Sequence, residues 1–222
     1  DRFAITIHDT DDEAHKIWRR VGVPVDGIYR FGDQDNWWGP AGLEGPCGPC
    51  SELHYDFGPD KGCRRSDCGP NCLNPDVISG TVCGRFVELW NLVFMQFYHH
   101  LDGKRTSLPA PSVDTGMGLE RLAVVMQGVS TIYDTDLFRP IIDKVEEMSG
   151  RKSNEDRDSM YAIRVVAEHS RSAAFLIADG VVPGNEGRGY VLRRVIRRAI
   201  RHGRHIGLDG SFLGELALLV ID

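Results

Sequence analysis

The chain has 222 residues, 41% of them hydrophobic, and a formal net charge of −6. This length allows one large domain or one and a half ordinary ones with an ample core, so stability does not require disulfides or a metal. The sequence has no apolar run long enough to span a membrane and no signal-peptide pattern, so we expect a cytoplasmic protein without a membrane partner. The net acidity argues against a general polyanion binder, but arginines crowd residues 188–204 and indicate a local anionic partner.

The first 84 residues begin with regular structure and continue into an irregular stretch. Residues 3–7 predict a short strand, and residues 10–20 predict a helix with Thr10 as N-cap and Glu13 at the capping-box position. Residues 33–84 are rich in Gly, Pro, Asp and Cys and show little periodicity, which predicts irregular structure around one short strand, 53–57. Such a long excursion within a compact domain is typical of a functional or a mobile segment.

The middle of the chain predicts two paired strands and a helix. Residues 86–98 are almost continuously apolar and aromatic, which favours a central strand covered on both faces. Asp102 and Gly103 form a hairpin turn into an extended segment that ends at Asp114, so the two strands pair antiparallel. Thr115 is the expected N-cap of a helix whose core face carries four apolar residues, Leu119, Leu122, Ala123 and Met126.

The last part of the chain is helical in pattern. Helices are predicted over residues 138–148, 158–178 and 189–207, and the polar stretch near residue 152 is the expected domain boundary. The predicted fold is therefore α+β, with an antiparallel sheet in residues 1–150 and a helical domain in residues 151–222.

The segment from Val113 to Arg121 could form a phosphate site. Gly116 and Gly118 lack Cβ atoms, so a flat ligand could approach the backbone where the helix begins, and free N–H groups there favour anions. Arg121 offers a planar fork of donors to a polyphosphate. A capped helix with a surface arginine explains the same spacing, and the spacing alone does not separate the two interpretations.

Asn91 and the cysteines are further candidates. An amide inside an apolar strand such as Asn91 either makes a hydrogen bond within the core or serves as a polar group of a pocket. Cys47 and Cys50 have CxxC spacing, which suits zinc, a redox pair or a tight turn, although the thioredoxin-like context is absent. Four more cysteines follow at uneven spacing, and they could close a tetrahedral zinc site or remain free thiols: Cys63, Cys68, Cys72 and Cys83.

The arginine-rich segment predicts a two-faced helix. Its apolar side carries Leu192, Ile196 and Ala199, while arginines cover much of the rest. Such a helix can be a solvated face, a membrane-surface helix or an RNA-backbone contact. Nearly all its charges are arginines, which suit bidentate phosphate contacts, and no Trp or Phe anchors it in lipid, so nucleic acid is favoured.

Taken together, these segments resemble the alanyl-tRNA synthetases, a family of class II aminoacyl-tRNA synthetases. The matching stretches cover most of the chain in the family's order: residues 35–38, 45–52, 88–97, 113–122, 133–138 and 179–198. The resemblance implies the antiparallel sheet of a class II catalytic core, and it implies ATP-dependent activation of L-alanine, with Mg²⁺, followed by transfer to the 3′ end of the tRNA.

The resemblance also implies roles for individual residues. Arg121 would act on the ATP phosphates as the catalytic arginine, with Gly116 and Gly118 beneath the nucleotide. Asp114 would receive the alanine ammonium, an amide would meet its carboxylate, and the small amino-acid pocket would be shaped by Trp38, Asn91, Val93 and Gly116. The tRNA acceptor stem would meet seven residues near the arginine-rich helix: Asn185, Arg188, Arg193, Arg194, Arg197, Arg198 and Arg201.

The sequence departs from the family in two ways. The family's motifs 1 and 2, which would precede Asp1, are absent, so we expect an internal fragment that lacks full activity by itself. Residues 61–83 are longer than the family core requires, which suggests a zinc-binding insertion that uses the four later cysteines. The alternative to a ligase fragment is a non-catalytic RNA-binding paralogue that retains the arginine-rich helix.

Overall fold

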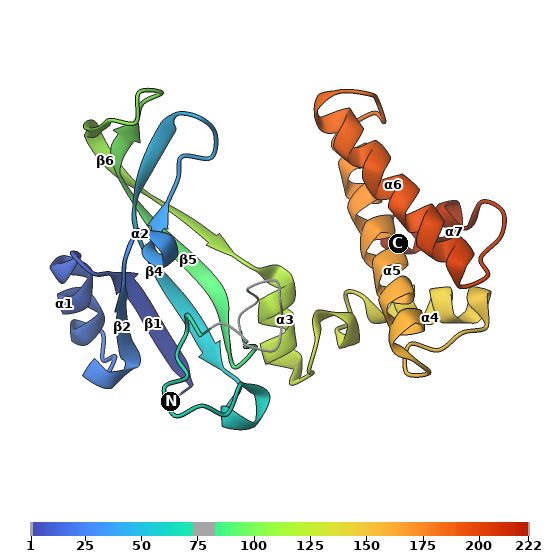
Figure 1. Ribbon diagram of the computed structural model, residues 1–222, viewed down its shortest axis with the longest axis horizontal. Helices are drawn as coiled ribbons and strands as arrows, with labels where there is room; N and C mark the ends of the chain where they lie inside the picture. Colours follow the sequence, from blue (N-terminus) through green and yellow to red (C-terminus); the bar gives the residue numbers. More distant parts are fainter. Residues whose placement is uncertain (1, 73–82, 222) are drawn as a thin grey trace. The chain divides into compact units, whose positions relative to one another are not determined.

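The computed structural model describes residues 2–72 and 83–221 and forms two compact units, residues 1–125 and 126–222 (Figure 1). Each unit has a core of its own and is described by itself. In the described part of the chain, none of the helices combines the length and the apolar character needed to cross a membrane.

Unit 1 is built on a mostly antiparallel sheet. Its strands are β1 (Phe3–His8), β2 (Ile28–Phe31), β3 (Trp37–Trp38), β4 (Gly45–Asp56), β5 (Phe86–His99) and β6 (Arg105–Met117). The order across the sheet is β2-β1-β4-β5-β6, and β3 pairs with β4. Only β1 and β2 are parallel among the described pairs. The predicted antiparallel hairpin of β5 and β6 is confirmed.

Helix α1 (Asp12–Arg20) covers one face of this sheet. Its residues Ala14 and Trp18 join a core cluster with Ile5, Ile7 and Leu53. The predicted N-cap was wrong, because the carboxylate of Asp11, and not Thr10, accepts the hydrogen bond from the Ala14 N–H at 2.8 Å. The Thr10 hydroxyl instead pairs with the His8 ring.

Strand β4 is much longer than the predicted strand 53–57. It includes the CxxC segment, which the sequence pattern had assigned to irregular structure. A register shift between Cys47 and Cys50 lets this Gly- and Pro-rich stretch stay paired with β5. Gly48 lies so close to β5 that an added Cβ would be 1.9 Å from the Phe94 carbonyl oxygen. The glycine therefore permits the close strand approach that local propensity argues against.

Strand β5 is not covered on both faces as expected. Leu89, Val93 and Met95 are buried, whereas the alternate residues from Trp90 to Tyr98 are only half-buried. The apolar run therefore overestimated how completely this strand is enclosed.

The end of β6 also differs from the prediction. The strand continues to Met117, so Thr115 lies in the strand and does not cap the helix α3 (Leu119–Gln127). Pairing with β5 extends the strand, since Thr115 is the register partner of Leu92. The expected core face of α3 was partly wrong, because Leu119 and Met126 are exposed and Val124 is the buried residue.

Unit 2 is helical. Its main helices are α4 (Arg139–Ser149), α5 (Arg157–Ala178), α6 (Gly187–His205) and α7 (Phe212–Ile221), and the first three confirm the predicted helices. Short elements complete the two units: η1 (Val25–Gly27), α2 (Asp33–Asn36), η2 (Pro59–Lys61) and η3 (Ile132–Asp134). The expected α+β fold, a largely antiparallel sheet followed by helices, is confirmed.

The compact units divide earlier than the boundary expected near residue 152. Helix α4 belongs to the core of unit 2, because Ile142 and Val145 pack in one buried cluster with Ile163 of α5 and Leu216 of α7. The assignment of residues 126–150 to the catalytic domain stays a prediction.

Candidate functional site

Two rungs of the sheet bring the predicted alanine-site residues together on the face opposite α1. In the first rung, Glu52 of β4 is the register partner of Asn91 of β5, which is the partner of Gly116 of β6. In the second rung, Cys50 faces Val93, and Val93 faces Asp114. Register partners in antiparallel strands point to the same side of a sheet, as do residues two apart. The pairing therefore collects Asn91, Val93, Asp114 and Gly116 in one place.

Glu52 is the centre of a polar network on this face. Its Oε1 accepts a hydrogen bond from Asn91 Nδ2 at 3.0 Å, and its Oε2 contacts Thr6 Oγ1 at 3.3 Å and His54 Nε2 at 3.1 Å. The buried Asn36 extends the network by donating to Thr6 Oγ1 at 2.8 Å. A carboxylate that is only 15% exposed is thus held by three neighbours that keep its orientation defined.

Some polar atoms around this network lack partners among the described residues. They are Asn36 Oδ1, Trp37 Nε1, His54 Nδ1 and Asn91 Oδ1, all of them buried. A buried polar atom without a partner costs about 1–3 kcal/mol, so each is a group that a ligand or water would satisfy. Of the two interpretations that the sequence left open for Asn91, a core hydrogen bond and a polar group of a pocket, the Oδ1 atom without a partner among the described residues favours the second, because only Nδ2 is engaged.

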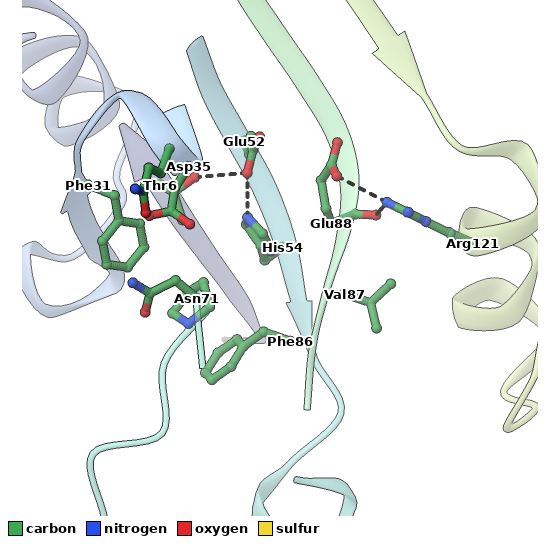
Figure 2. A pocket seen from close by; sticks show the side chains of 12 residues that line it. Thr6, Phe31, Asp35, Glu52, His54, Asn71, Phe86, Val87, Glu88 and Arg121 are labelled. Atoms are coloured by element: carbon green, nitrogen blue, oxygen red, sulfur yellow. Dashed lines mark hydrogen bonds and ion pairs between the residues drawn. The ribbon is translucent and has the colours of Figure 1, made fainter. Parts of the chain in front are cut away.

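A cavity of about 380 Å³ opens beside the network. Figure 2 shows Glu52 linked to Thr6 and His54 on one side of it, with Arg121 reaching Glu88 on another. Phe31 and Phe86 give the cavity an apolar part, whereas carboxylates give it an acidic part. The cavity therefore offers both an aromatic surface and charged groups to one ligand.

Arg121 lines this cavity but is already paired. Its Nη1 donates to the Glu88 carbonyl at 2.8 Å and lies 3.1 Å from Glu88 Oε2, with half of its side chain exposed. Gly118 makes room for it, since an added Cβ would lie 3.1 Å from Arg121 Cδ. The Gly118 N–H donates to the Leu89 carbonyl and is not free for an anion. Within this segment, the guanidinium of Arg121 is therefore available to bind a phosphate, and the Gly118 amide is not.

The predicted residues at the edge of this face are open to solvent. Asp114 is exposed on β6, and a Cβ at Gly116 would meet no protein atom within 4 Å. Trp38 is 38% exposed in β3, which pairs with β4 at Gly48. The ring of its neighbour Trp37 instead packs within the protein, stacked on the Phe97 ring with 5.7 Å between the ring centroids. The space over Gly116 is open, which suits a ligand lying across the strand.

The CxxC pair does not behave as a reactive or metal-binding pair. Both thiols are buried within β4. Burial, with a smaller contribution from Glu52, raises the pKa of Cys50 to about 12, and burial also raises the pKa of Cys47. Both therefore stay protonated near neutral pH, whereas the thiolate is the nucleophile and the metal ligand.

The four later cysteines converge in space despite their uneven spacing. The Sγ atoms of Cys63, Cys68, Cys72 and Cys83 all lie within 4.8 Å of one another, and none is in a disulfide. Two of the pairs, Cys63 with Cys72 and Cys68 with Cys83, are 3.4 Å apart. Zinc–sulfur bonds of about 2.3 Å in a tetrahedron place sulfur atoms about 3.8 Å apart, so the donor set fits Zn²⁺ in number, type and spacing.

Unit 2 carries a groove of about 890 Å³ along α6. Its lining includes Asn185 and five of the predicted arginines: Arg193, Arg194, Arg197, Arg198 and Arg201. Arg188 is exposed at the start of α6 but does not line the groove. Burial, with the nearby charges of Arg198 and Arg201, lowers the pKa of His202, so its ring is neutral near pH 7. The arginines therefore make this groove basic.

Some arginines are oriented by polar neighbours. Arg193 Nη1 donates to Asn185 Oδ1, and Arg198 Nη2 donates to the Tyr161 hydroxyl at 2.6 Å. The guanidinium of Arg194 lies over the Tyr190 ring at 5.8 Å. A row of oriented, exposed guanidinium groups on one helix face is suited to contact with a phosphate backbone.

Comparison with known proteins decides the family. A family model described as tRNA synthetases class II (A) matches residues 1–222. The chain belongs to this family. It is 53% identical over its whole length to proteins named alanine–tRNA ligase from Dehalococcoides mccartyi and, over 226 aligned residues, Oleidesulfovibrio alaskensis. It is 51% identical over 96% of its length to one from Anaeromyxobacter dehalogenans. The chain spans 24% of the length of the first two relatives and 23% of the third.

Within this class II (A) synthetase chain, sequence reasoning did not single out Thr6, Glu52, His54 and Glu88 as site residues. A signal was present, since the polar residues 52, 54 and 56 alternate along β4 and so share one face of it. Glu88 was assigned to the opposite side of β5 from Asn91. The register shift between Leu53 and His54 makes it the partner of His54, and no local pattern predicts such a shift.

Proposed function

We propose that this chain is part of an alanine–tRNA ligase, which activates L-alanine with ATP and transfers it to the 3′ end of its tRNA. The observation that carries the proposal is the convergence of Asn91, Val93, Asp114 and Gly116 on two rungs of the sheet beside the cavity. The names of the relatives, at 51–53% identity over nearly the whole chain, support the same activity.

In this proposal the alanine ammonium lies between two acceptors. Asp114 supplies a carboxylate, and Asn91 supplies Oδ1, the buried oxygen without a partner among the described residues. This differs from the role that the sequence suggested for the amide, contact with the alanine carboxylate, because Nδ2 already donates to Glu52. A cation that meets both oxygens would satisfy the unpaired Asn91 atom, which an anion would not.

Val93 and Trp38 limit the size of the amino acid. Val93 is 5% exposed and packs with Cys50 and Met95, so it presents a firm apolar surface next to Asp114. Each additional methylene of a competing amino acid would change binding by only about 1–3 kcal/mol in such a pocket. The two walls therefore discriminate best against much larger side chains.

ATP would occupy the cavity, with Arg121 on its phosphates, and would extend from it over the open backbone at Gly116. Asp35, Glu52 and Glu88 line the same cavity, and carboxylate oxygens are the protein ligands that Mg²⁺ takes in nucleotide sites. The Arg121 contact with Glu88 then keeps the guanidinium extended along the cavity until phosphate oxygens compete for it. Bound Mg²⁺ would neutralise negative charge on the phosphates.

The reaction needs positioning more than a protein nucleophile. A carboxylate oxygen of alanine attacks the α-phosphorus of ATP, a new C–O–P linkage forms, and pyrophosphate leaves. A ribose hydroxyl at the tRNA 3′ end then attacks the carbonyl carbon, the bond from this carbon to the phosphate oxygen breaks, and AMP leaves as the hydroxyl proton passes to the departing phosphate. Asp114 and Asn91 hold the amino acid in place for the first step, and Arg121 stabilises the charge that develops on the phosphates.

Unit 2 would bind the acceptor stem of the tRNA through the arginine groove of α6. The arginines would contact the phosphate backbone, and Asn185 would lie at the end of the groove, oriented by Arg193. RNA helices expose hydroxyls and base edges in a shallow minor groove, where an amide can make hydrogen bonds.

A chimera tests the ligase proposal. Because the chain spans only part of its relatives, we expect near-background activity from the 222 residues alone. Replacing the matched segment of the Dehalococcoides mccartyi protein with this chain should give a protein that catalyses alanine-dependent ATP–pyrophosphate exchange. Asp114→Ala should lower kcat/KM for alanine about a hundredfold, since it removes a charged partner. Asp102→Asn, which removes a carboxylate from the exposed β5–β6 turn, is the matched control. An inactive chimera, or equal effects of both changes, would contradict the proposal.

The 222-residue chain itself serves to test tRNA binding. Arg194→Ala and Arg197→Ala should each weaken binding and lower the salt dependence by about one phosphate contact. Arg204→Ala, an exposed arginine of α6 outside the groove, should change binding much less. Binding in an exchange-inactive chimera would favour the alternative that the sequence left open, a non-catalytic RNA-binding paralogue.

A further inference from the structure

The four-cysteine cluster lies at the base of the loop that connects β4 to β5. A backbone hydrogen bond joins two of the four cysteines, since the Cys83 N–H donates to the Cys72 carbonyl at 2.9 Å. Just after Cys83, Arg85 binds Asp56 at the end of β4 through two contacts of 2.8 and 2.7 Å. The cluster is therefore anchored to the ends of both strands that carry the site.

The segment between Cys68 and Cys72 reaches the cavity. Pro70, which is buried, and Asn71 both line it, and Figure 2 shows Asn71 near Phe31 and Phe86. Gly69 lies against Tyr29, whose ring contacts those of Phe31 and Phe86, because an added Cβ at Gly69 would lie 3.7 Å from the Tyr29 ring. Two cysteines of the cluster thus bracket the residues that form this wall.

Little secondary structure supports this wall. Between Cys63 and Cys72 the described backbone makes turn contacts, such as Cys68 N–H to Arg65 carbonyl at 3.3 Å, and no helix or strand. Holding a loop of this kind in one conformation costs about 1–2 kcal/mol of backbone entropy for each ordered residue. A metal ion that ties Cys68 and Cys72 to one point offsets that cost.

We propose that Cys63, Cys68, Cys72 and Cys83 bind one Zn²⁺, and that the metal holds Pro70 and Asn71 in place as a wall of the nucleotide cavity. The metal site rests on the four sulfur positions alone, and the identity of the ligand in the cavity rests on the proposed ligase function. Because the wall is shared, metal binding and nucleotide binding favour each other, and this coupling is reciprocal. The four cysteines then position Asn71, whose amide contacts the nucleotide.

The metal half of the proposal is tested on the 222-residue chain by elemental analysis after purification under reducing conditions. We expect about one zinc per chain, as a four-thiolate site predicts. Cys68→Ser with Cys83→Ser should abolish it, whereas Cys47→Ala removes a buried thiol outside the cluster and should retain it. Zinc well below one per chain in the unaltered protein would overturn the site, whatever the variants do.

The coupling half is tested in the chimera by the rate at which a chromogenic chelator removes zinc. Saturating Mg²⁺–ATP should slow zinc release several-fold, and Asn71→Ala should remove most of that protection while zinc content stays at one. Ser66→Ala, an exposed residue of the same loop, is the matched control and should keep the protection. Zinc release that ATP does not change would overturn the coupling.

The two proposals fail in different ways. A chimera without pyrophosphate exchange that still holds one zinc would contradict the ligase and leave the metal site standing. An active chimera without zinc, or one whose KM for ATP is the same with and without zinc, would contradict the inference and leave the ligase standing. We expect removal of zinc to raise the KM for ATP about tenfold, a coupling of about 1.4 kcal/mol.

Discussion

Replacement of Glu52 tests whether its network is what holds the site face together. Glu52→Ala removes the acceptor of Asn91 Nδ2, and an unpaired buried donor costs about 1–3 kcal/mol. The lost methylene adds about 0.8 kcal/mol. Thr6 and His54 line the cavity, where water can take the place of the removed carboxylate, so they add little. We therefore expect unit 1 to lose about 2–4 kcal/mol of its unfolding free energy.

Glu52→Gln should cost much less, about 1 kcal/mol, because the isosteric amide keeps one acceptor for Asn91. Its NH₂ group would face His54 Nε2, and the His54 ring can accept there if its proton moves to Nδ1, the atom that lacks a partner among the described residues. The difference between the two variants separates a lost hydrogen-bond partner from a lost charge.

Urea unfolding followed by tryptophan fluorescence measures this effect in unit 1 alone, because all the tryptophans lie within residues 1–125. A loss of 2–4 kcal/mol would lower the midpoint by about 1–2 M urea at an ordinary m-value. Glu13→Ala, an exposed glutamate of α1, should stay within about 0.5 kcal/mol of the original chain. A Glu52→Ala change as small as this control, or a Glu52→Gln change as large as Glu52→Ala, would refute the reasoning.

Three further predictions concern single residues. Burial opposes ionisation of Glu146, but hydrogen bonds from Ser153 and nearby positive charges outweigh it and lower its pKa to about 2. The lowered pKa stabilises the folded state of unit 2 by on the order of 3 kcal/mol. This stabilisation is fully present above the unfolded pKa of 4.5 and is lost as the pH falls towards 2. Acid titration by far-UV circular dichroism should show the loss of stability, and the Glu146→Gln variant should no longer show it. Gly203→Ala places a Cβ 2.3 Å from the buried ring of Phe212 and should destabilise unit 2 by about 1–3 kcal/mol. Gly214→Ala in α7 meets no atom within 4 Å and should stabilise unit 2 slightly. Thermal unfolding measures both changes, and equal effects would contradict the packing argument. Gly116→Ala should leave the unfolding free energy of unit 1 unchanged but lower the kcat/KM of the chimera for alanine about tenfold. The reason is that the added methyl group would occupy space that no described protein atom fills and that a ligand would use. Unchanged kinetics would argue against a ligand at this position.

Features that depend on local sequence were predictable. The helices α4, α5 and α6 follow from apolar periodicity, and the β5–β6 hairpin follows from Asp102 and Gly103 between two extended runs. The arginine face of α6 was visible in the same way, because helical spacing alone decides which residues share a side. Where two local signals competed, as at Thr10 and Asp11, the cap was assigned to the wrong neighbour.

The site depended on contacts between distant parts of the chain. By itself the sequence determined the helices α4, α5 and α6 and the hairpin, and it offered Asn91, Asp114 and Arg121 as candidate residues, but it did not predict α7. Only the tertiary structure decided that β4 runs through the CxxC segment and that Glu52 joins Thr6, His54 and Asn91. It also brought four unevenly spaced cysteines within 4.8 Å of one another. The physical reason is that strand register and loop closure are set by partners far away in the chain, whereas helical periodicity is set by neighbours within one turn.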